Sequence, residues 1–419
     1  MQRSLIAISL VMAPIALAVA LLAAGASPEQ PAWWSSSVAL AILGGITIMI
    51  YGINIHSVPE HSGRQWASLG LIATQIGAGV IGAWLVFFGR GYRIDAMEIT
   101  GHLLATIGAV LFMANIGLLF RQPGPPRPSK VPRDQRTNQQ RVDRLAIPFT
   151  IISGLMSIAG TGLGLVLSVW TPRFGRWDLV WAHVLLLGFF FSMASGTSYH
   201  MLSRWTGRPW RSIRLVQVHL YAYLVSFPLM VIALAWDIER LFFIAGPLMA
   251  VAMMAWAGNI LPMATHTPGQ VRVGIVVAMA FLAIGVAFGV MFAVDPGTGP
   301  RLRGAHVSAN LYGFAGLLIS GFGYGFIPRI AGTSGLRWPS LAPLQIAIMA
   351  VGSLGSMVSM GMWMYGNASA DLVRLSCTVA SLGMVLFAIQ VFGSFWLDSP
   401  ETSERASSAS STTIQQPGH

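Results

Sequence analysis

Apolar runs of about 20 residues recur along this 419-residue chain, and each is long enough to cross the hydrocarbon core of a bilayer as a helix. Only 9% of the residues are charged and 54% are hydrophobic, whereas a soluble domain usually carries about 25% charged residues. The sequence therefore predicts an all-α, polytopic membrane protein. The twelve expected spans are 3–25, 34–55, 66–88, 98–120, 145–170, 179–203, 213–236, 241–262, 272–294, 305–327, 341–364 and 374–397.

The positive charge, +11 from 25 Lys and Arg against 14 Asp and Glu, is arranged as a topology signal and not as a nucleic-acid-binding surface. With both termini inside, seventeen of the basic residues lie in cytoplasmic segments and eight in outer loops. Because basic residues favour the cytoplasmic side, we expect cytoplasmic termini in a bacterial-type inner membrane. Lipid is then the main partner, and nucleic acid is not one.

Residues 1–397 are expected to form one transmembrane domain with a Pro- and Arg-rich cytoplasmic linker at 121–144. The polar tail 398–419 is rich in Ser and Thr, which predicts disorder. Residues 1–26 also resemble a signal peptide, since Arg3 precedes an apolar run. That run is about twice the usual signal length, so we favour a retained first helix over a cleaved segment.

The second, sixth and tenth spans end in related sequences. Five residues of span six, Ser195, Gly196, Tyr199, Arg204 and Gly207, align with Ser320, Gly321, Tyr324, Arg329 and Gly332 of span ten at an offset of 125. Span two aligns with span six at an offset of 144, which pairs Gly52 with Gly196, His56 with His200 and Gly63 with Gly207. Because the matched spans are four apart, they predict three pseudo-repeated four-helix units, about 1–120, 145–262 and 272–397. The alternative is chance matching of small residues in Gly-rich helices.

We expect no Asp, Glu, Lys or Arg well inside any span, which argues against an ion-driven transporter. Histidines and a few amides remain, and His102, His183 and His306 each lie about one turn inside the outer end of a span. Neutral imidazole is a good ligand for haem iron or copper, although it can instead bond a neighbouring helix backbone. At His306 we favour a ligand, because Asn310 and Gly313 continue a flat polar stripe.

Cysteine chemistry is excluded as an alternative basis for a metal site. The chain has a single cysteine, Cys377, which can form neither a disulfide framework nor a cysteine-built metal or iron–sulfur site.

Two stretches resemble subunit I of the haem–copper oxidases, in the form found in C-type cytochrome c oxidases and nitric oxide reductases. The first runs from Trp181 and His183 through Tyr199–Pro209 to His219, and the second from Arg303 and His306 through Asn310 to Gly332. The motifs cover roughly seventy residues, and twelve spans in a three-by-four arrangement are also that family's fold.

The departures from the family decide which cofactors the resemblance implies. In the family, two helix-ten histidines separated by one residue bind the high-spin and the low-spin haem. In this sequence His306 stands at the first position, whereas Ser308 replaces the histidine at the second. The copper ligand of helix six is matched by His183, whereas the helix-seven histidine pair would fall near Ala233 and Leu234. The resemblance thus implies one b-type haem, little copper and no low-spin haem.

The resemblance also implies roles for individual residues. His306 would be the proximal haem ligand, and His183 a distal group, a sixth ligand or a residual copper ligand. Asn310 would lie beside the haem, and His102 is an alternative ligand. Guanidinium groups suit haem propionates, which implies roles for three outer arginines: Arg301, Arg303 and Arg374.

Three functions remain open at this point. The first is an oxidoreductase subunit in respiratory electron transfer or in oxygen or nitric oxide chemistry, with a cytochrome c-like or other redox partner. The second follows from Trp205–Arg208, which resembles a motif of the NnrS haem-and-copper membrane proteins tied to nitric oxide response. The third is a cofactor-poor structural or assembly subunit that kept the fold alone.

Overall fold

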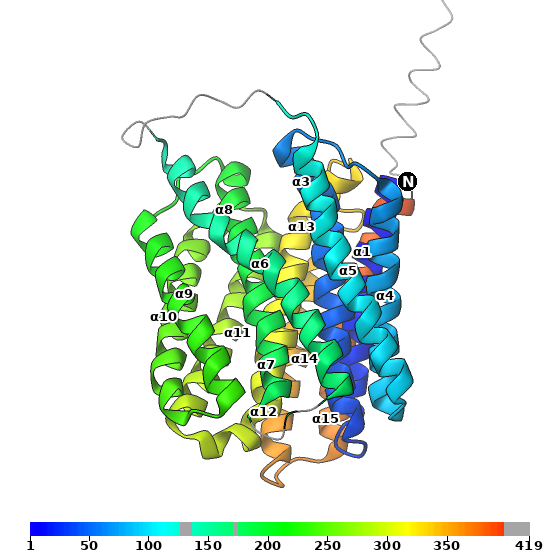
Figure 1. The fold of residues 1–419 in the computed structure, drawn as a ribbon, viewed down its shortest axis with the longest axis vertical. Coiled ribbons are helices and arrows are strands. Elements are labelled where there is room, and N and C mark those ends of the chain that lie inside the picture. The colour runs from blue at the N-terminus through cyan, green and yellow to red at the C-terminus, as the bar shows by residue number, and fades with distance from the viewer. Residues whose placement is uncertain (126–135, 171, 173–174, 398–419) are drawn as a thin grey trace, which may run out of the picture.

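Figure 1 presents the computed structural model, which describes residues 1–125, 136–170, 172 and 175–397. Residues 126–135 of the expected linker and the tail 398–419 lie outside the described residues. The first helices are α1 (Gln2–Ala26), α2 (Ala32–Leu40), η1 (Ala41–Thr47), α3 (Ile48–Ser62), α4 (Leu69–Tyr92), α5 (Asp95–Arg121), α6 (Asn138–Val169), α7 (Trp177–His183), η2 (Val184–Phe191) and α8 (Ser192–Thr206). The remaining helices are α9 (Ile213–Trp236), α10 (Glu239–Ala264), α11 (Gly269–Val294), η3 (Pro296–Thr298), α12 (Gly299–Val307), η4 (Ser308–Gly316), α13 (Leu317–Ala331), α14 (Leu341–Trp363) and α15 (Ala370–Trp396).

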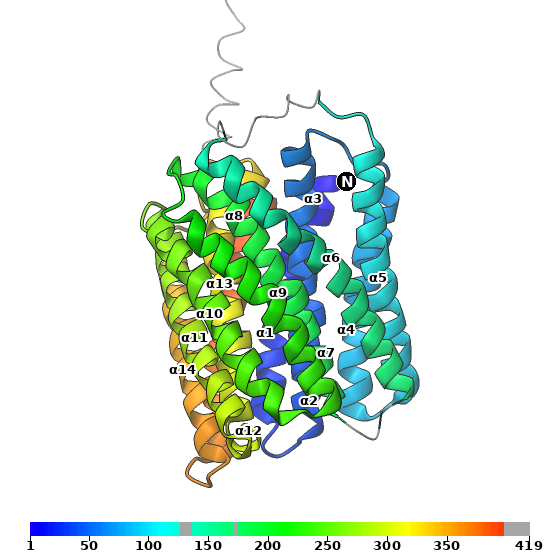
Figure 2. The ribbon, with the colours of Figure 1, turned by 60° about the vertical axis from the view of Figure 1, so that its left-hand side comes forward.

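Twelve helices of the described chain are long and apolar enough to cross a membrane, and no strand occurs among the described residues. The prediction of an all-α, multi-pass membrane protein is therefore confirmed. Large apolar side chains stay exposed along the outer helices, where lipid tails solvate them as well as a protein core does. The N-terminus and the end of α15 lie at the same end of the bundle, called here the N-terminal side (Figures 1 and 2); the opposite end is the far side.

Three of the twelve spans form the interior of the bundle. They are the composite helices α2–η1–α3, α7–η2–α8 and α12–η4–α13, whose apolar windows are 89%, 67% and 83% buried. The windows of the other nine spans are 33–61% buried. A helix that is apolar and enclosed on all sides belongs to the core, so the second, sixth and tenth spans are the central ones.

The three central helices share an irregularity at matching positions. Each changes from α-helix to π-helix, and the π segments η1, η2 and η4 end at Thr47, Phe191 and Gly316. Each is followed by a 15-residue α-helix. These helices end at glycines with positive φ: Gly63, Gly207 and Gly332. The ends are 144 and 125 residues apart, which are the offsets of the sequence alignment.

Two boundaries differ by seven residues from the sequence prediction: α3 continues to Ser62, past the expected end of span two at residue 55, and span five begins early. Helix α6 begins at Asn138, seven residues before the expected start of span five. Thr137 accepts from the backbone N–H of Gln140, whose side chain bonds back to the backbone of Thr137. This capping box satisfies two backbone donors at the helix start. The last part of the expected linker is therefore helical.

Candidate functional site

Two of the predicted histidines line one cavity together on the far side of the bundle. It holds about 760 Å³ of unfilled volume, its open mouth included. We call it the histidine cavity. Its walls come from α7, η2, α9, α10, α11, α12 and η4, and include His183, His306, Asn310, Leu186, Leu187, Phe190, Phe191, Phe314, Met230, Met249, Met253, Gly285 and Gly289.

His183 reaches this cavity with one ring nitrogen available. It is the last residue of α7, where its Nδ1 lies 2.7 Å from the carbonyl oxygen of Leu179. A carbonyl can only accept, so Nδ1 carries the proton and Nε2 keeps its lone pair. Holding Nδ1 in this way is how proteins fix the tautomer of a metal-binding histidine.

His306 lines the same cavity in a different hydrogen-bonding state. The Asn310 amide nitrogen donates to the backbone carbonyl of His306 at 2.9 Å and lies 3.3 Å from its Nδ1. In this arrangement Nδ1 is the acceptor and Nε2 carries the proton. Metal binding through Nε2 therefore requires the other tautomer, with the Asn310 amide turned to offer its oxygen to Nδ1.

Helix α11 forms the wall beside His306. A Cβ at Gly285 would collide with the side-chain amide of Asn310, so this glycine lets the amide pack against the helix backbone. A Cβ at Gly289 would lie 3.7 Å from Cε1 of His306. The rings of Phe292 and His306 have centroids 5.3 Å apart. The His306 ring is thus held between α11 and its own helix.

None of the three arginines predicted near the cofactor is among the residues that line the histidine cavity. The guanidinium of Arg303 pairs at 2.9 Å with Asp178, which lies five residues before His183 on α7. Arg301 lies over the ring of Tyr365. Arg374 pairs with Asp371 of its own helix, α15, and with Glu29 in the connection between α1 and α2. These two carboxylates neutralise its charge.

His102 lies outside the histidine cavity, in a closely packed cluster between α4, α5, α6 and α7. Its Nε2 is 3.1 Å from a guanidinium nitrogen of Arg90, which also bonds Glu98 at 2.6 Å. Arg90 lies 5.0 Å above the ring of Trp181. Arg90 and Glu98 lie at the ends of α4 and α5 and are only 18% and 22% exposed, because each neutralises the other.

The other positions that the resemblance singled out, Ser308, Ala233 and Leu234, are buried and pack against neighbouring helices. Ser308 is fully buried and donates to the sulfur of Met360 at 3.3 Å. Ala233 and Leu234 are buried against Val180 and Phe242. One turn before them on α9, Met230 reaches the histidine cavity.

A second cavity was not foreseen from the sequence. It lies between the three central helices and holds about 540 Å³ of unfilled volume, its mouth included. We call it the central cavity. Its lining consists of Met49, Ile50, Ile53, Asn54, Phe190, Met193, Ala194, Thr197, Ser198, Leu318, Ile319 and Phe322. No sequence signal marks such a space, since its residues are those of any apolar core.

No family model and no curated protein matches this sequence. Within the described residues, no group of three or more His, Cys, Asp or Glu side chains is placed to hold a metal ion. The imidazoles among the residues that line the histidine cavity are those of His183 and His306.

Proposed function

We propose that this chain is a divergent haem–copper oxidase subunit I-like membrane protein that binds one b-type haem in the histidine cavity. The supporting observation is that His183 and His306, 123 residues apart in sequence, line a single cavity. With them come a flat glycine-containing wall and aromatic side chains. A bound haem would supply an iron centre for electron transfer or for oxygen or nitric oxide binding.

The proposed three-unit architecture explains why these two histidines share one cavity. At the offset of 125, His306 is equivalent to Trp181, and His183 is equivalent to Ser308. Two residues along a helix turn a side chain by about 200°. The two histidines therefore do not occupy equivalent places in their units, and can face each other across the space between the second and third units.

Buried polar pairs also support the three units. The amide of Gln75 bonds Asn115 at 2.9 Å, and Tyr324 bonds Gln345 at 2.8 Å. The hydroxyl of Tyr199 lies 3.0 Å from Nδ1 of His219. Gln75, His219 and Gln345 are 144 and 126 residues apart, and each keeps one buried nitrogen without a partner. Each unit thus has a polar contact at nearly the same place.

One of the two cavity histidines is ready to bind haem iron, and the other needs a change of tautomer. His183 has an Nε2 lone pair ready for iron, whereas His306 becomes a ligand when Asn310 turns its amide oxygen toward Nδ1. Arg303, three residues before His306 and paired with Asp178, is the arginine that we expect to meet a haem propionate. With cytoplasmic termini, the far side is the outer face of the inner membrane, and a redox partner would approach there.

Pyridine haemochrome analysis with metal analysis of the purified protein tests the proposal. We expect close to one b-type haem per chain and little copper, because two imidazoles line the cavity and no third histidine does. The His200→Ala variant should keep its haem, since His200 pairs with Asp143 on the N-terminal side. If the protein is purified from haem-replete cells and contains no haem, the proposal is wrong. Stoichiometric copper would favour the NnrS-like alternative.

A cofactor-poor structural subunit is the second candidate. The contact between Asn310 and His306 favours it, because a histidine that accepts from its own helix neighbour already has a structural partner. This candidate predicts no haem in the wild type and no optical change on reduction. The same haemochrome measurement therefore separates the two candidates.

A further inference from the structure

The central cavity lies on the opposite side of Phe190 from the histidine cavity. Along the composite helix α7–η2–α8, Leu186 and Leu187 line the histidine cavity before Phe190, and Met193 and Ala194 line the central cavity after it. Phe190 itself lines both and is 6% exposed. Its ring therefore stands between the two spaces.

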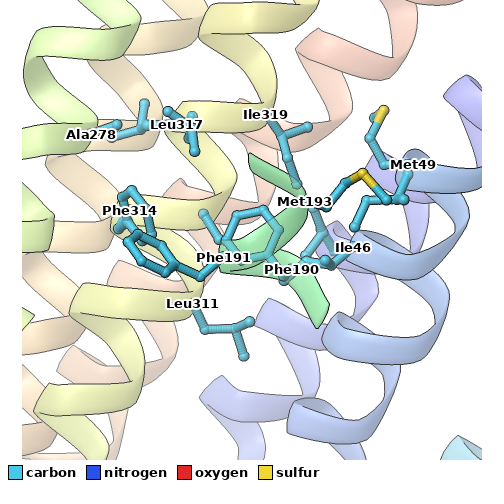
Figure 3. Close-up of a cluster of buried hydrophobic side chains, with 14 of the residues drawn as sticks. Ile46, Met49, Phe190, Phe191, Met193, Ala278, Leu311, Phe314, Leu317 and Ile319 are labelled. Carbon is cyan, nitrogen blue, oxygen red and sulfur yellow. The ribbon is translucent and has the colours of Figure 1, made fainter. Parts of the chain in front are cut away.

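Side chains from all three central helices meet around this ring. Figure 3 shows Ile46 and Met49 on one side of Phe190 and Phe314 on the other, with Met193 beside it. The ring centroids of Phe190 and Phe314 are 6.0 Å apart at an interplanar angle of 59°. Phe190 is thus the residue that lines both cavities, and its aromatic neighbour Phe314 lines the histidine cavity alone.

Three of the residues that line the central cavity are polar, namely Asn54, Thr197 and Ser198, and the other nine are apolar. The Asn54 amide nitrogen donates to the carbonyl of Ile50 at 2.8 Å. The Ser198 hydroxyl donates to the carbonyl of Ser195 at 2.9 Å and accepts from the Trp256 indole at 3.1 Å. Each molecule in a chain of buried waters needs about two to four polar partners, so this lining suits apolar guests better than water.

We propose that the central cavity is a binding site for small apolar gas molecules, and that Phe190 is the barrier across which they pass to the histidine cavity. Apolar cavities stay dry and take up apolar guests such as xenon. The site lies between the three most buried helices of the bundle, where a lipid chain anchored at the surface has no place. The passage to the histidine cavity rests on the proposed function, whereas the binding site does not.

Xenon is the probe for the binding site, measured by diffraction from xenon-pressurised crystals of the purified full chain. We expect xenon in the central cavity of the wild type. The Leu318→Phe variant should lose this xenon, because Leu318 is 2% exposed and lines only this cavity. The Ile50→Phe variant fills the same space from α3 and replaces the first variant if that one does not fold.

The matched control is Leu344→Phe, the same change at a side chain that is 52% exposed on the outside of α14. It should keep the central xenon. A wild type without xenon between the central helices would overturn the binding site, and so would xenon that persists there in both filled variants.

Flash photolysis of the carbon monoxide complex tests the barrier. Phe190→Ala should lower the fraction of carbon monoxide that rebinds before leaving the histidine cavity, because the second cavity becomes open to it. Leu318→Phe should raise that fraction. Unchanged rebinding in Phe190→Ala would overturn the barrier. If the protein holds no haem, the proposed function fails, and xenon occupancy alone decides the binding site.

Discussion

Two sets of buried histidines lie on the far side of this bundle, and their surroundings differ in one decisive respect. His102 has an arginine on one ring nitrogen and a helix backbone pressed against its other edge. His183 and His306 border a cavity. All three looked alike in sequence, at the same depth in an apolar helix. What separates a structural histidine from a candidate ligand is the unfilled volume next to it.

The charged neighbours of His102 explain its different environment. Arg90 and Glu98 belong to consecutive helices joined by a tight turn, and they pair across it at 2.6 Å. A charge in a membrane is tolerated when it is paired, and His102 accepts a further hydrogen bond from the same arginine. This cluster ties α4 to α5 and α7. The histidine cavity has no charged group among its lining residues.

The largest effect is expected from removing a ligand. His306→Ala should lower the haem content below about a tenth of the wild-type value, because losing even an outer partner of a metal ligand costs about 10–100-fold in affinity. Haem per chain is measured by pyridine haemochrome on protein that elutes as a single folded species.

The matched control for that change is His102→Gln, whose side-chain oxygen can still accept from Arg90. This variant should retain its haem. If the His102 variant lost the haem and the His306 variant kept it, the two sites would have to exchange their roles.

A smaller change is expected from the second imidazole. His183→Ala should leave haem bound but alter its spin state or its affinity for carbon monoxide or nitric oxide, since His183 lines the cavity and its Nε2 keeps a lone pair. Optical spectra and gas titrations of the variant and wild type provide the measurement. Identical spectra and affinities in both proteins would place His183 outside the ligand environment.

The charged cluster should matter for stability and not for haem. Arg90→Met leaves Glu98 and His102 without their shared partner. It should lower the free energy of unfolding by about 3 kcal/mol, the lower end for breaking a buried pair. The control is Arg374→Met, whose pairs are about half exposed and should contribute roughly 0–1 kcal/mol. Unfolding in detergent, followed by tryptophan fluorescence, distinguishes them; equal losses would mean that Arg90 is as well solvated as Arg374.

The sequence predicted the positions of the helices better than it predicted the contacts between them, and the reason is physical. The twelve spans followed from hydrophobic length alone, and the three glycines that the alignment pairs, Gly63, Gly207 and Gly332, each follow the end of a helix with positive φ. These are local properties. The ion pair between Arg90 and Glu98 was missed because each residue, taken alone, sits at a helix end where charge is ordinary.

The resemblance, and not the spacing of the residues, predicted that His183 and His306 lie near each other, on either side of one haem, and the two do line one cavity. The sequence contained no measure of the volume between them. The central cavity left no signal at all, because an apolar residue that packs and one that lines a space have the same chemistry. Shared cavities depend on how helices from different units pack, which is a tertiary property.

The smallest expected effect tests how closely His102 is packed. A Cβ added at Gly164 of α6 would lie 2.6 Å from Nδ1 of His102 and 2.7 Å from the indole nitrogen of Trp181. Such contacts force side chains to shift, and overpacking of this kind costs about 1–3 kcal/mol. Gly162→Ala is the matched control two residues away, where a Cβ meets nothing within 4 Å. We therefore expect Gly164→Ala to unfold at a lower temperature than Gly162→Ala while both bind haem as the wild type does. Equal unfolding temperatures would show that the His102 ring has room to move, and the contrast between a filled histidine site and an open one would then no longer hold.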